Sequence, residues 1–207
     1  MNSTSHDKEI WKPGNMLYPL PVVMVSCQKE GGKPNIITVA WAGTICTNPA
    51  MVSISVRKER FSHSIIRESG EFVINLTTRE LAFATDYCGV KSGRDVDKFQ
   101  EMKLTAQKAQ VVSCPLIAES PVNIECRVTD IRELGSHDMF IAEVVSVSAS
   151  PQYMDEQGRF DFRKTDPICY SHGEYYTLGD KIGKFGYSVK KKRKAVSKKK
   201  TKSYHLS

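Results

Sequence analysis

Three basic residues and two serines stand close together where the pattern predicts the start of a short helix: Arg57, Lys58, Arg60, Ser62 and Ser64. A helix N-terminus presents unpaired backbone N–H groups and the positive end of the helix dipole. Cations and hydroxyl groups beside it add charge-assisted hydrogen bonds to an anion. The stretch therefore favours a phosphate group as its ligand. On the charge pattern alone, the alternative interpretation is a solvated turn, because charged side chains are mostly exposed.

A second group of small polar side chains precedes this corner, on two segments rich in β-forming residues and in the turn between them. These segments are Asn35–Trp41 and Met51–Arg57, and the expected turn is Thr44–Pro49. Amides and hydroxyls suit the polar edge of a planar ring, whereas an apolar strand suits its flat face. The candidate contacts are Asn35, Thr38, Ala40, Trp41, Thr44, Ser53 and Ser55. Alternatively, the tryptophan belongs to the core or to an interface, and the two strand serines face solvent.

Glycines mark a third stretch, in which Cys88-Gly89 and Ser92-Gly93 stand shortly before a D-x-D-K-F motif that contains Lys98. Glycine allows the backbone to approach a ligand closely. Cys88 has the position of a redox thiol, but no second cysteine stands nearby in the sequence to resolve a disulfide. A spectator thiol is the expected role, because a free cysteine is usually a packing residue.

The remaining cysteines and the histidines give no pattern of metal ligands. The six cysteines are spread singly, without a C-x-x-C pair, which argues against a disulfide framework and against a zinc site. His172, within the segment YSHGEYYTLG, is a candidate contact on the substrate side, with a structural histidine at an interface as the alternative.

The elements that must position these groups are mostly strands. Leu20–Ser26, Asn35–Trp41, Met51–Arg57 and Phe72–Leu76 have strand patterns, and Val122–Leu134 pairs with Met139–Ser148 in a predicted hairpin. Short helices are expected at Ser62–Glu68, closed by Gly70, and after capping boxes at Thr77 and Ser92. This order favours an antiparallel barrel over a βαβ fold, and neither G-x-G-x-x-G nor a P-loop motif is present.

The order of these motifs from Asn35 through Lys98-Phe99 resembles the flavin reductase-like family, and within it the flavoredoxin-type proteins that bind FMN. The resemblance extends over Met16–Lys190. It implies a mainly β fold, the FMN-binding split β-barrel, antiparallel and Greek-key-like with a few short helices. It also implies that the glycine-rich loop with Cys88, Gly89 and Ser92 borders the flavin. Phosphate contacts are implied at the basic corner, with Lys98 as a further one.

The activity implied by the resemblance is NAD(P)H-dependent reduction of flavin or of a downstream acceptor, by hydride transfer to flavin N5. This reaction requires no nucleophile from the protein, because the cofactor carries the chemistry and no side chain is assigned as catalytic. The alternative is a flavin-binding electron carrier without significant NAD(P)H oxidation of its own. The resemblance further implies a homodimer, with a small molecule or a protein as electron acceptor.

Composition divides the chain into a polar segment (residues 1–15), a single domain (16–190) and a basic tail (191–207). The formal net charge of +7 comes from nine bases after residue 189, and without them 21 bases stand against 23 acids. Such a like-charged run is expected to be disordered. Nucleic-acid binding, limited to this tail, is a weak third hypothesis. No apolar run is long enough to span a membrane and no signal sequence is visible, so a cytoplasmic protein is expected.

Overall fold

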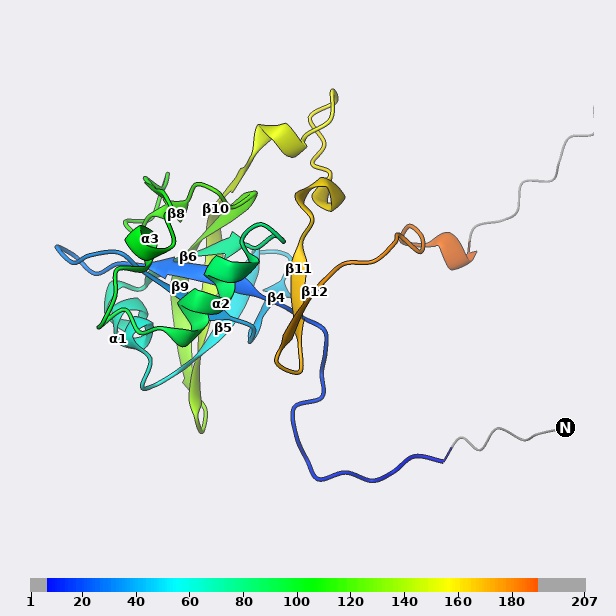
Figure 1. The fold of residues 1–207 in the computed structure, drawn as a ribbon, viewed down its shortest axis with the longest axis horizontal. Helices are drawn as coiled ribbons and strands as arrows, with labels where there is room; N and C mark the ends of the chain where they lie inside the picture. Colours follow the sequence, from blue (N-terminus) through cyan, green and yellow to red (C-terminus); the bar gives the residue numbers. More distant parts are fainter. Residues whose placement is uncertain (1–6, 190–207) are drawn as a thin grey trace, which may run out of the picture.

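The fold is organised around one seven-stranded antiparallel sheet (Figure 1). The computed structural model describes residues 7–189. The strand order is β3-β2-β6-β9-β10-β5-β4. The strands are β2 (Val23–Cys27), β3 (Asn35–Val39), β4 (Ala42–Cys46), β5 (Met51–Arg57), β6 (Glu71–Leu76), β9 (Val122–Glu133) and β10 (His137–Ala149).

The sheet curls into a barrel because its two edge strands, β3 and β4, follow one another in the chain. They are joined through Ala40 and Trp41, and the Ser55 N–H in β5 donates to the Trp41 carbonyl oxygen at 2.8 Å. Beyond this corner β3 and β5 are not paired, so the barrel is split along the seam between them. The connection from β5 to β6 skips the β9–β10 hairpin, as in a Greek key. The predicted antiparallel split barrel is confirmed.

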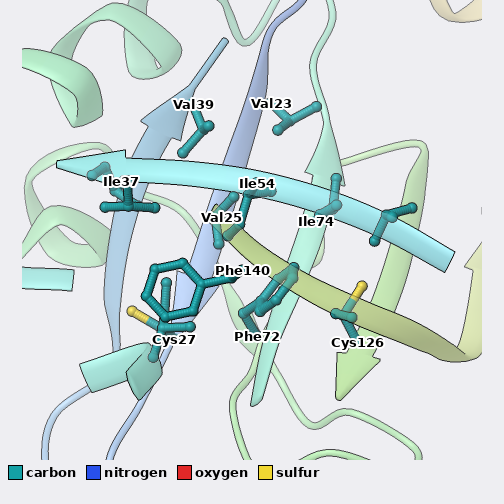
Figure 2. Close-up of a cluster of buried hydrophobic side chains, with 14 of the residues drawn as sticks. Val23, Val25, Cys27, Ile37, Val39, Ile54, Phe72, Ile74, Cys126 and Phe140 are labelled. Atoms are coloured by element: carbon teal, nitrogen blue, oxygen red, sulfur yellow. The ribbon is translucent and has the colours of Figure 1, made fainter. Parts of the chain in front are cut away.

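Apolar side chains from alternate strand positions fill the barrel (Figure 2). In β5, Val52, Ile54 and Val56 are buried and the residues between them are partly exposed, which confirms the predicted faces. Phe72 from β6 and Phe140 from β10 lie at the centre and are fully buried. Removing this apolar surface from water is the main favourable contribution to folding.

Helix α1 (Phe61–Ser69) follows β5 after a short turn, close to the predicted Ser62–Glu68. Its Ile65 and Ile66 pack into the barrel core. The helix ends at Gly70, which has a positive φ of 68° and whose N–H donates to the Ile66 carbonyl. Glycine adopts this left-handed conformation without strain, so the predicted end of the helix is also confirmed.

Helices α2 (Ala82–Val90) and α3 (Lys98–Glu101) pack on β2 and β3 through a second apolar cluster that includes Met24 and Ile36. Both helices were expected from the sequence, but the predicted capping boxes are wrong.

In place of a cap, the Thr77 hydroxyl donates to the Val22 carbonyl at 2.6 Å. The turn before α2 is instead held by Thr78, whose Oγ1 accepts from the Leu81 N–H. The N-cap of α3 is Asp97, not Ser92. The Asp97 side chain thus caps α3, whereas the N-cap residue of α2, Leu81, makes no side-chain hydrogen bond to the first turn. Both helices begin about one turn later than the motifs suggest.

The segment predicted as a turn at Thr44–Pro49 is partly strand. Thr44 lies in β4, opposite Val52, and the turn begins only at Thr47. Threonine is common both in turns and in strands, and the pairing with β5 decides in favour of a strand here.

A second, three-stranded sheet with the order β1-β11-β12 was not predicted. It joins β1 (Leu20–Pro21) to the hairpin of β11 (Ile168–Ser171) and β12 (Glu174–Thr177), which stands beside the barrel (Figure 1). The remaining short elements are β7 (Ala106–Gln107), β8 (Leu116–Ile117) and the 3₁₀ turns η1 (Pro151–Tyr153), η2 (Phe162–Thr165) and η3 (Tyr187–Val189).

Both ends of the described chain extend away from the barrel (Figure 1). Ile10 and Leu17 near one end are 98% and 84% exposed, and Ile182 and Phe185 near the other end are equally accessible. No helix within residues 7–189 is long and apolar enough to cross a membrane. The basic tail predicted from the sequence lies outside the described residues.

Candidate functional site

Two cavities meet at the split side of the barrel. The strand cavity, of about 460 Å³, lies along the seam between β3 and β5. The cationic cavity, of about 270 Å³, lies between the β5–α1 turn and the loop that joins α2 to α3. Ile37, Arg57 and Arg60 line both, so the two cavities form one continuous cleft.

The strand cavity has an aromatic rim and a lining of both polar and apolar groups. Thr38, Ala40 and Trp41 line it from the β3 side, and Ser55 lines it from β5. The indole of Trp41 is 39% exposed and lies parallel to the His137 ring, with centroids 6.2 Å apart and an angle of 8°. A cavity with an aromatic border suits a planar ring.

The second sheet completes the rim of the strand cavity with Tyr170 and Tyr175. The Tyr170 ring lies 6.4 Å from that of Trp41, and the Tyr175 hydroxyl donates to Asp86 at 3.1 Å. Burial, followed by this hydrogen bond, raises the pKa of Tyr175 to about 12. The phenol therefore remains a neutral hydrogen-bond donor at physiological pH.

Helix α2 approaches β3 closely at the edge of the cleft. The Thr38 hydroxyl donates to the Thr85 carbonyl, and a Cβ added at Gly89 would lie 3.2 Å from the Thr38 Cβ. Glycine therefore keeps the α2 backbone against the strand that lines the cavity.

Five cations and one carboxylate surround the cationic cavity: Arg57, Arg60, Lys91, Arg94 and Lys98, with Glu59. Glu59 forms an exposed ion pair with Arg57 at 3.3 Å. The excess of positive charge stands beside the start of α1, whose N-cap residue Arg60 makes no side-chain hydrogen bond to the first turn. Such a site favours an anion.

Lys98 is the most buried of these cations, with 3% of its surface exposed. Its Nζ donates to the carbonyls of Ile36 at 2.7 Å and Cys88 at 2.8 Å, which uses two of its three donors. Burial lowers the pKa of Lys98 from its ordinary 10.5 to about 8. An anion in the cavity would stabilise the charged form of this ammonium group.

The backbone of the glycine-rich loop packs tightly beside the same cavity. Asn35 Nδ2 donates to Ser62 Oγ at 2.7 Å, and a Cβ at Gly93 would lie only 2.1 Å from Asn35 Oδ1 and 2.8 Å from a ring carbon of Phe61. Only glycine fits there. The Arg94 guanidinium lies over the Phe61 ring at 5.5 Å, which orients it beside the cavity.

Cys88 lies beside the cationic cavity but is fully buried in the second apolar cluster. Burial raises the pKa of its thiol to about 11, so the nucleophilic thiolate is scarce at neutral pH. Within residues 7–189, no group of three or more His, Cys, Asp or Glu side chains could hold a metal ion.

Comparison with known proteins identifies the family of the chain. A model of the flavin reductase like domain matches residues 15–179. The chain belongs to this family. The resemblance inferred from the sequence motifs is confirmed, and membership assigns the chain a flavin-related redox role.

Two solved flavoredoxins share the fold along their entire length. That of Desulfovibrio vulgaris (Miyazaki F) superposes with a TM-score of 0.83 at 30% identity, covering 89% of this chain and 100% of its own. That of Methanosarcina acetivorans has a TM-score of 0.80 at 30% identity with the same coverage. These similarities confirm the predicted relationship to flavoredoxin-type proteins.

Two relatives extend the comparison at the sequence level. An uncharacterized protein of Archaeoglobus fulgidus is 31% identical over 161 residues, which are 78% of this chain and 89% of the relative. An NADPH-flavin oxidoreductase of Streptomyces viridifaciens is 26% identical over 129 residues, covering 61% of this chain and 65% of the relative.

Most of the residues that the sequence analysis proposed for a flavin site line the cleft. Those in the strand cavity are Thr38, Ala40, Trp41, Ser55 and Gly89, and those in the cationic cavity are Asn35, Ser62, Cys88, Ser92 and Lys98. Arg57 and Arg60 line both. Their contact with a flavin stays a prediction.

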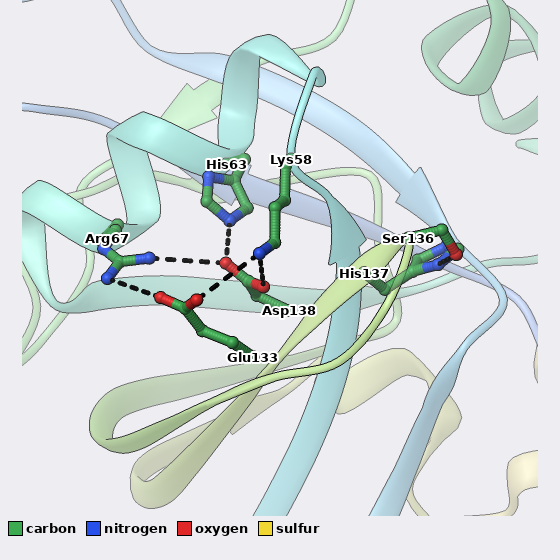
Figure 3. A network of polar contacts seen from close by, with 7 residues as sticks. All are labelled: Lys58, His63, Arg67, Glu133, Ser136, His137 and Asp138. Atoms are coloured by element: carbon green, nitrogen blue, oxygen red, sulfur yellow. Dashed lines mark hydrogen bonds and ion pairs between the residues drawn. The ribbon is translucent and has the colours of Figure 1, made fainter.

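Five other proposed residues line neither cavity. Thr44 and Ser53 lie farther along the barrel, on β4 and β5, and the Ser64 hydroxyl donates to the Phe61 carbonyl within α1. His172 lies against the Tyr18 ring at 4.2 Å. Lys58 points away from the cleft towards Asp138 (Figure 3), because the strand alternation ends where the turn begins.

Sequence reasoning missed several residues that line the cleft: Lys91, Arg94, Asp86, His137, Tyr170 and Tyr175. Lys91 and Arg94 stand between the glycine-rich motif and D-x-D-K-F, so cations interleaved with glycines were an available signal. The two tyrosines come from a hairpin more than 30 residues after His137 and more than 70 residues after Lys98, and nothing local indicates their contact with the cleft.

Proposed function

We propose that the protein binds FMN across the two cavities and catalyses its reduction by NAD(P)H, passing electrons on to free flavin, another small acceptor or a protein. The observation that carries the proposal is the union of an aromatic-rimmed cavity with a cationic one. This matches a planar ring joined by a short chain to a phosphate. When bound, the flavin supplies the redox chemistry, accepting hydride at N5.

The residues of the chain divide the binding between them. Backbone groups of β3 and the Trp41 indole would border the ring, with Ser55 along the path towards the phosphate. Arg57, Arg60 and the third donor of Lys98 would hold the phosphate by charge-assisted hydrogen bonds. Tyr170 and Tyr175 would shield the ring side from water, which favours hydride transfer over side reactions.

FMN is favoured over FAD because the cations gather in one small cavity. Five of them surround about 270 Å³, which suits a terminal phosphate. NAD(P)H as the donor is supported by the similarity to the NADPH-flavin oxidoreductase. The similarity to flavoredoxins supports the second candidate function, an electron carrier that receives electrons from another protein.

One experiment separates these possibilities. The purified protein is titrated with FMN, FAD and riboflavin, and the visible spectrum of the complex is followed as NADH or NADPH is added without oxygen. We expect FMN to bind most tightly and its visible absorbance to bleach with at least one nucleotide. FAD binding ten-fold more tightly than FMN would refute the phosphate assignment. Bound FMN that neither nucleotide reduces would leave the carrier function.

We also propose that two copies of the chain associate through their extended ends. Ile10, Trp11 and Leu17 at one end, and Ile182 and Phe185 at the other, are 72–111% exposed in the single chain. Strongly exposed apolar side chains on segments that leave the barrel are candidates for burial against a second copy. Sedimentation should give a dimer at micromolar concentration, and a monomer at that concentration would refute the proposal.

A further inference from the structure

A buried carboxylate, that of Asp138, contacts the β5–α1 turn and the first turn of α1 beside the cationic cavity. Alternation along β10 directs His137 to the strand cavity and Asp138 to the barrel interior, opposite Val56. Asp138 is fully buried, whereas His137 is only partly so. Of two adjacent residues of β10, His137 therefore lines the cleft and Asp138 lies in the barrel interior.

Three basic side chains converge on this carboxylate (Figure 3). His63 Nε2 lies 2.8 Å from Oδ2, and Arg67 Nη1 lies 3.4 Å from the same atom. Lys58 Nζ lies 3.3 Å from Oδ1, an ion pair without hydrogen-bond geometry. Burial alone would raise the pKa of Asp138, but the hydrogen bond with His63 and the nearby charge of Lys58 outweigh it and lower the pKa, so the group is ionised.

The partners of Asp138 flank the cations that face the cleft. Lys58 lies just after Arg57 and before Arg60, and His63 lies in the first turn of α1. The turn itself is closed by a hydrogen bond from the Arg60 N–H to the Arg57 carbonyl at 3.1 Å. The chain is thus held to one carboxylate on both sides of Arg60, while its two arginines point into the cleft.

We propose that Asp138 is a positioning residue for the phosphate of the bound flavin: by holding Lys58 and His63, it fixes the turn that carries Arg57 and Arg60. This inference rests on the proposed function. Asp138 contacts no ligand itself, since it is enclosed behind the turn. Glu133 also pairs with Lys58 and Arg67, but its side chain is 60% exposed, so its contribution to the position of the turn is small.

The test compares FMN with riboflavin, which has the same ring but no phosphate. Asp138→Asn keeps the size of the side chain and removes its charge. We expect FMN affinity to fall at least ten-fold and riboflavin affinity to stay within about two-fold. Glu133→Gln, which changes the exposed member of the same network, is the matched control and should leave both affinities within about two-fold. A general loss of structure would lower both affinities together.

An FMN to riboflavin ratio in Asp138→Asn equal to that of the parent protein would overturn the inference. If the parent protein itself binds FMN and riboflavin equally, the proposed phosphate site is refuted, and the role of Asp138 is refuted with it. If Asp138→Asn does not fold, Lys58→Met replaces it in the test, because Lys58 is half-exposed and its substitution should be tolerated. It should also lower FMN affinity selectively, and an unchanged ratio there would equally overturn the inference.

A double-mutant cycle separates positioning from direct contact. If Lys58 acts through Asp138, adding Lys58→Met to Asp138→Asn lowers FMN affinity by less than the product of the two separate effects. Fully multiplicative effects would mean that Lys58 meets the phosphate itself, which overturns the role assigned to the pair.

Discussion

The two halves of the cleft are built by different means. The strand cavity rests on β3 and β5, whose positions are set by backbone hydrogen bonds of the barrel and by buried residues such as Ile54. The cationic cavity is assembled from a turn, a helix start and a loop, held by side-chain contacts such as those of Lys98 and Asp138. Single side chains should therefore matter far more for the phosphate end of the flavin than for its ring end.

Arg57→Ala is the strongest test of this difference. Because Arg57 is proposed to donate a charge-assisted hydrogen bond to the phosphate, its loss should weaken FMN binding by about 1.5–3 kcal/mol and riboflavin binding by far less. Isothermal titration of both ligands measures the contrast. Arg79→Ala, which breaks an exposed ion pair with Asp166 outside the cleft, is the control and should change neither affinity. Equal losses for both flavins would show that Arg57 supports the ring or the fold.

Gly93→Ala tests how tightly the cationic half is packed. The new Cβ would meet Asn35 Oδ1 at 2.1 Å, and such overpacking costs about 1–3 kcal/mol. Chemical unfolding should show this loss, and FMN affinity should fall because Asn35 and Ser62 must shift.

Gly43→Ala is the matched control for this substitution, since a Cβ there has no atom within 4 Å. It should change the free energy of unfolding by less than about 0.5 kcal/mol. If Gly93→Ala behaves in the same way, the loop is more adaptable than its contacts indicate.

The same contrast explains what the sequence could predict. Strand alternation is a local signal, so the faces of β5 and the positions of Ser55 and Arg57 followed directly from it. Where the strand ends, that signal is lost. Lys58 has the same charge as its neighbours, yet only the position of Asp138, 80 residues later, decides that it turns away from the cleft.

Contacts distant in the chain account for the other differences. Tyr170 and Tyr175 reach the cleft because β11 pairs with the two-residue strand β1, a pairing too short to leave a pattern. Thr77 did not cap α2 because its hydroxyl is bonded to Val22 across the sheet. Tertiary hydrogen bonds outweigh the local capping preference in such cases.

FMN affinity should depend on pH through Lys98, whose pKa is about 8 in the flavin-free protein. Below this pH the ammonium is already charged, so binding requires no proton uptake. Above this pH, Lys98 is neutral in the free protein and must take up a proton from solvent when the dianionic phosphate binds. FMN affinity therefore falls as the pH rises from 8 towards the higher pKa of Lys98 in the complex. The loss is about 1.4 kcal/mol for each unit by which binding raises the pKa.

Fluorescence titration from pH 7 to 10 measures this dependence, in a range where the phosphate remains dianionic. Riboflavin serves as the control ligand, and its affinity should stay flat until other groups titrate. Parallel curves for the two flavins would mean that Lys98 does not face the phosphate and serves only to bond the carbonyls of Ile36 and Cys88.

The smallest effect is expected from Cys88→Ser. The thiol lies at the junction of the cleft with the second apolar cluster, and its raised pKa keeps it protonated. Hydride transfer to a flavin demands positioning of the two rings, not a thiolate. The rate of NAD(P)H-driven flavin reduction should therefore stay within about ten-fold of the parent. Cys88→Ala controls for the polar hydroxyl that serine places in an apolar site.

The two substitutions together distinguish packing from sulfur chemistry, because both remove the sulfur and only serine adds a polar group. A fall of more than about a thousand-fold in both variants, with FMN still bound, would require a thiol relay in place of direct hydride transfer. A fall in the serine variant alone would place the effect in the packing around Met24 and Ile36. If the parent protein reduces no flavin with either NADH or NADPH, its electrons must come from another protein, and the electron-carrier function is the one supported.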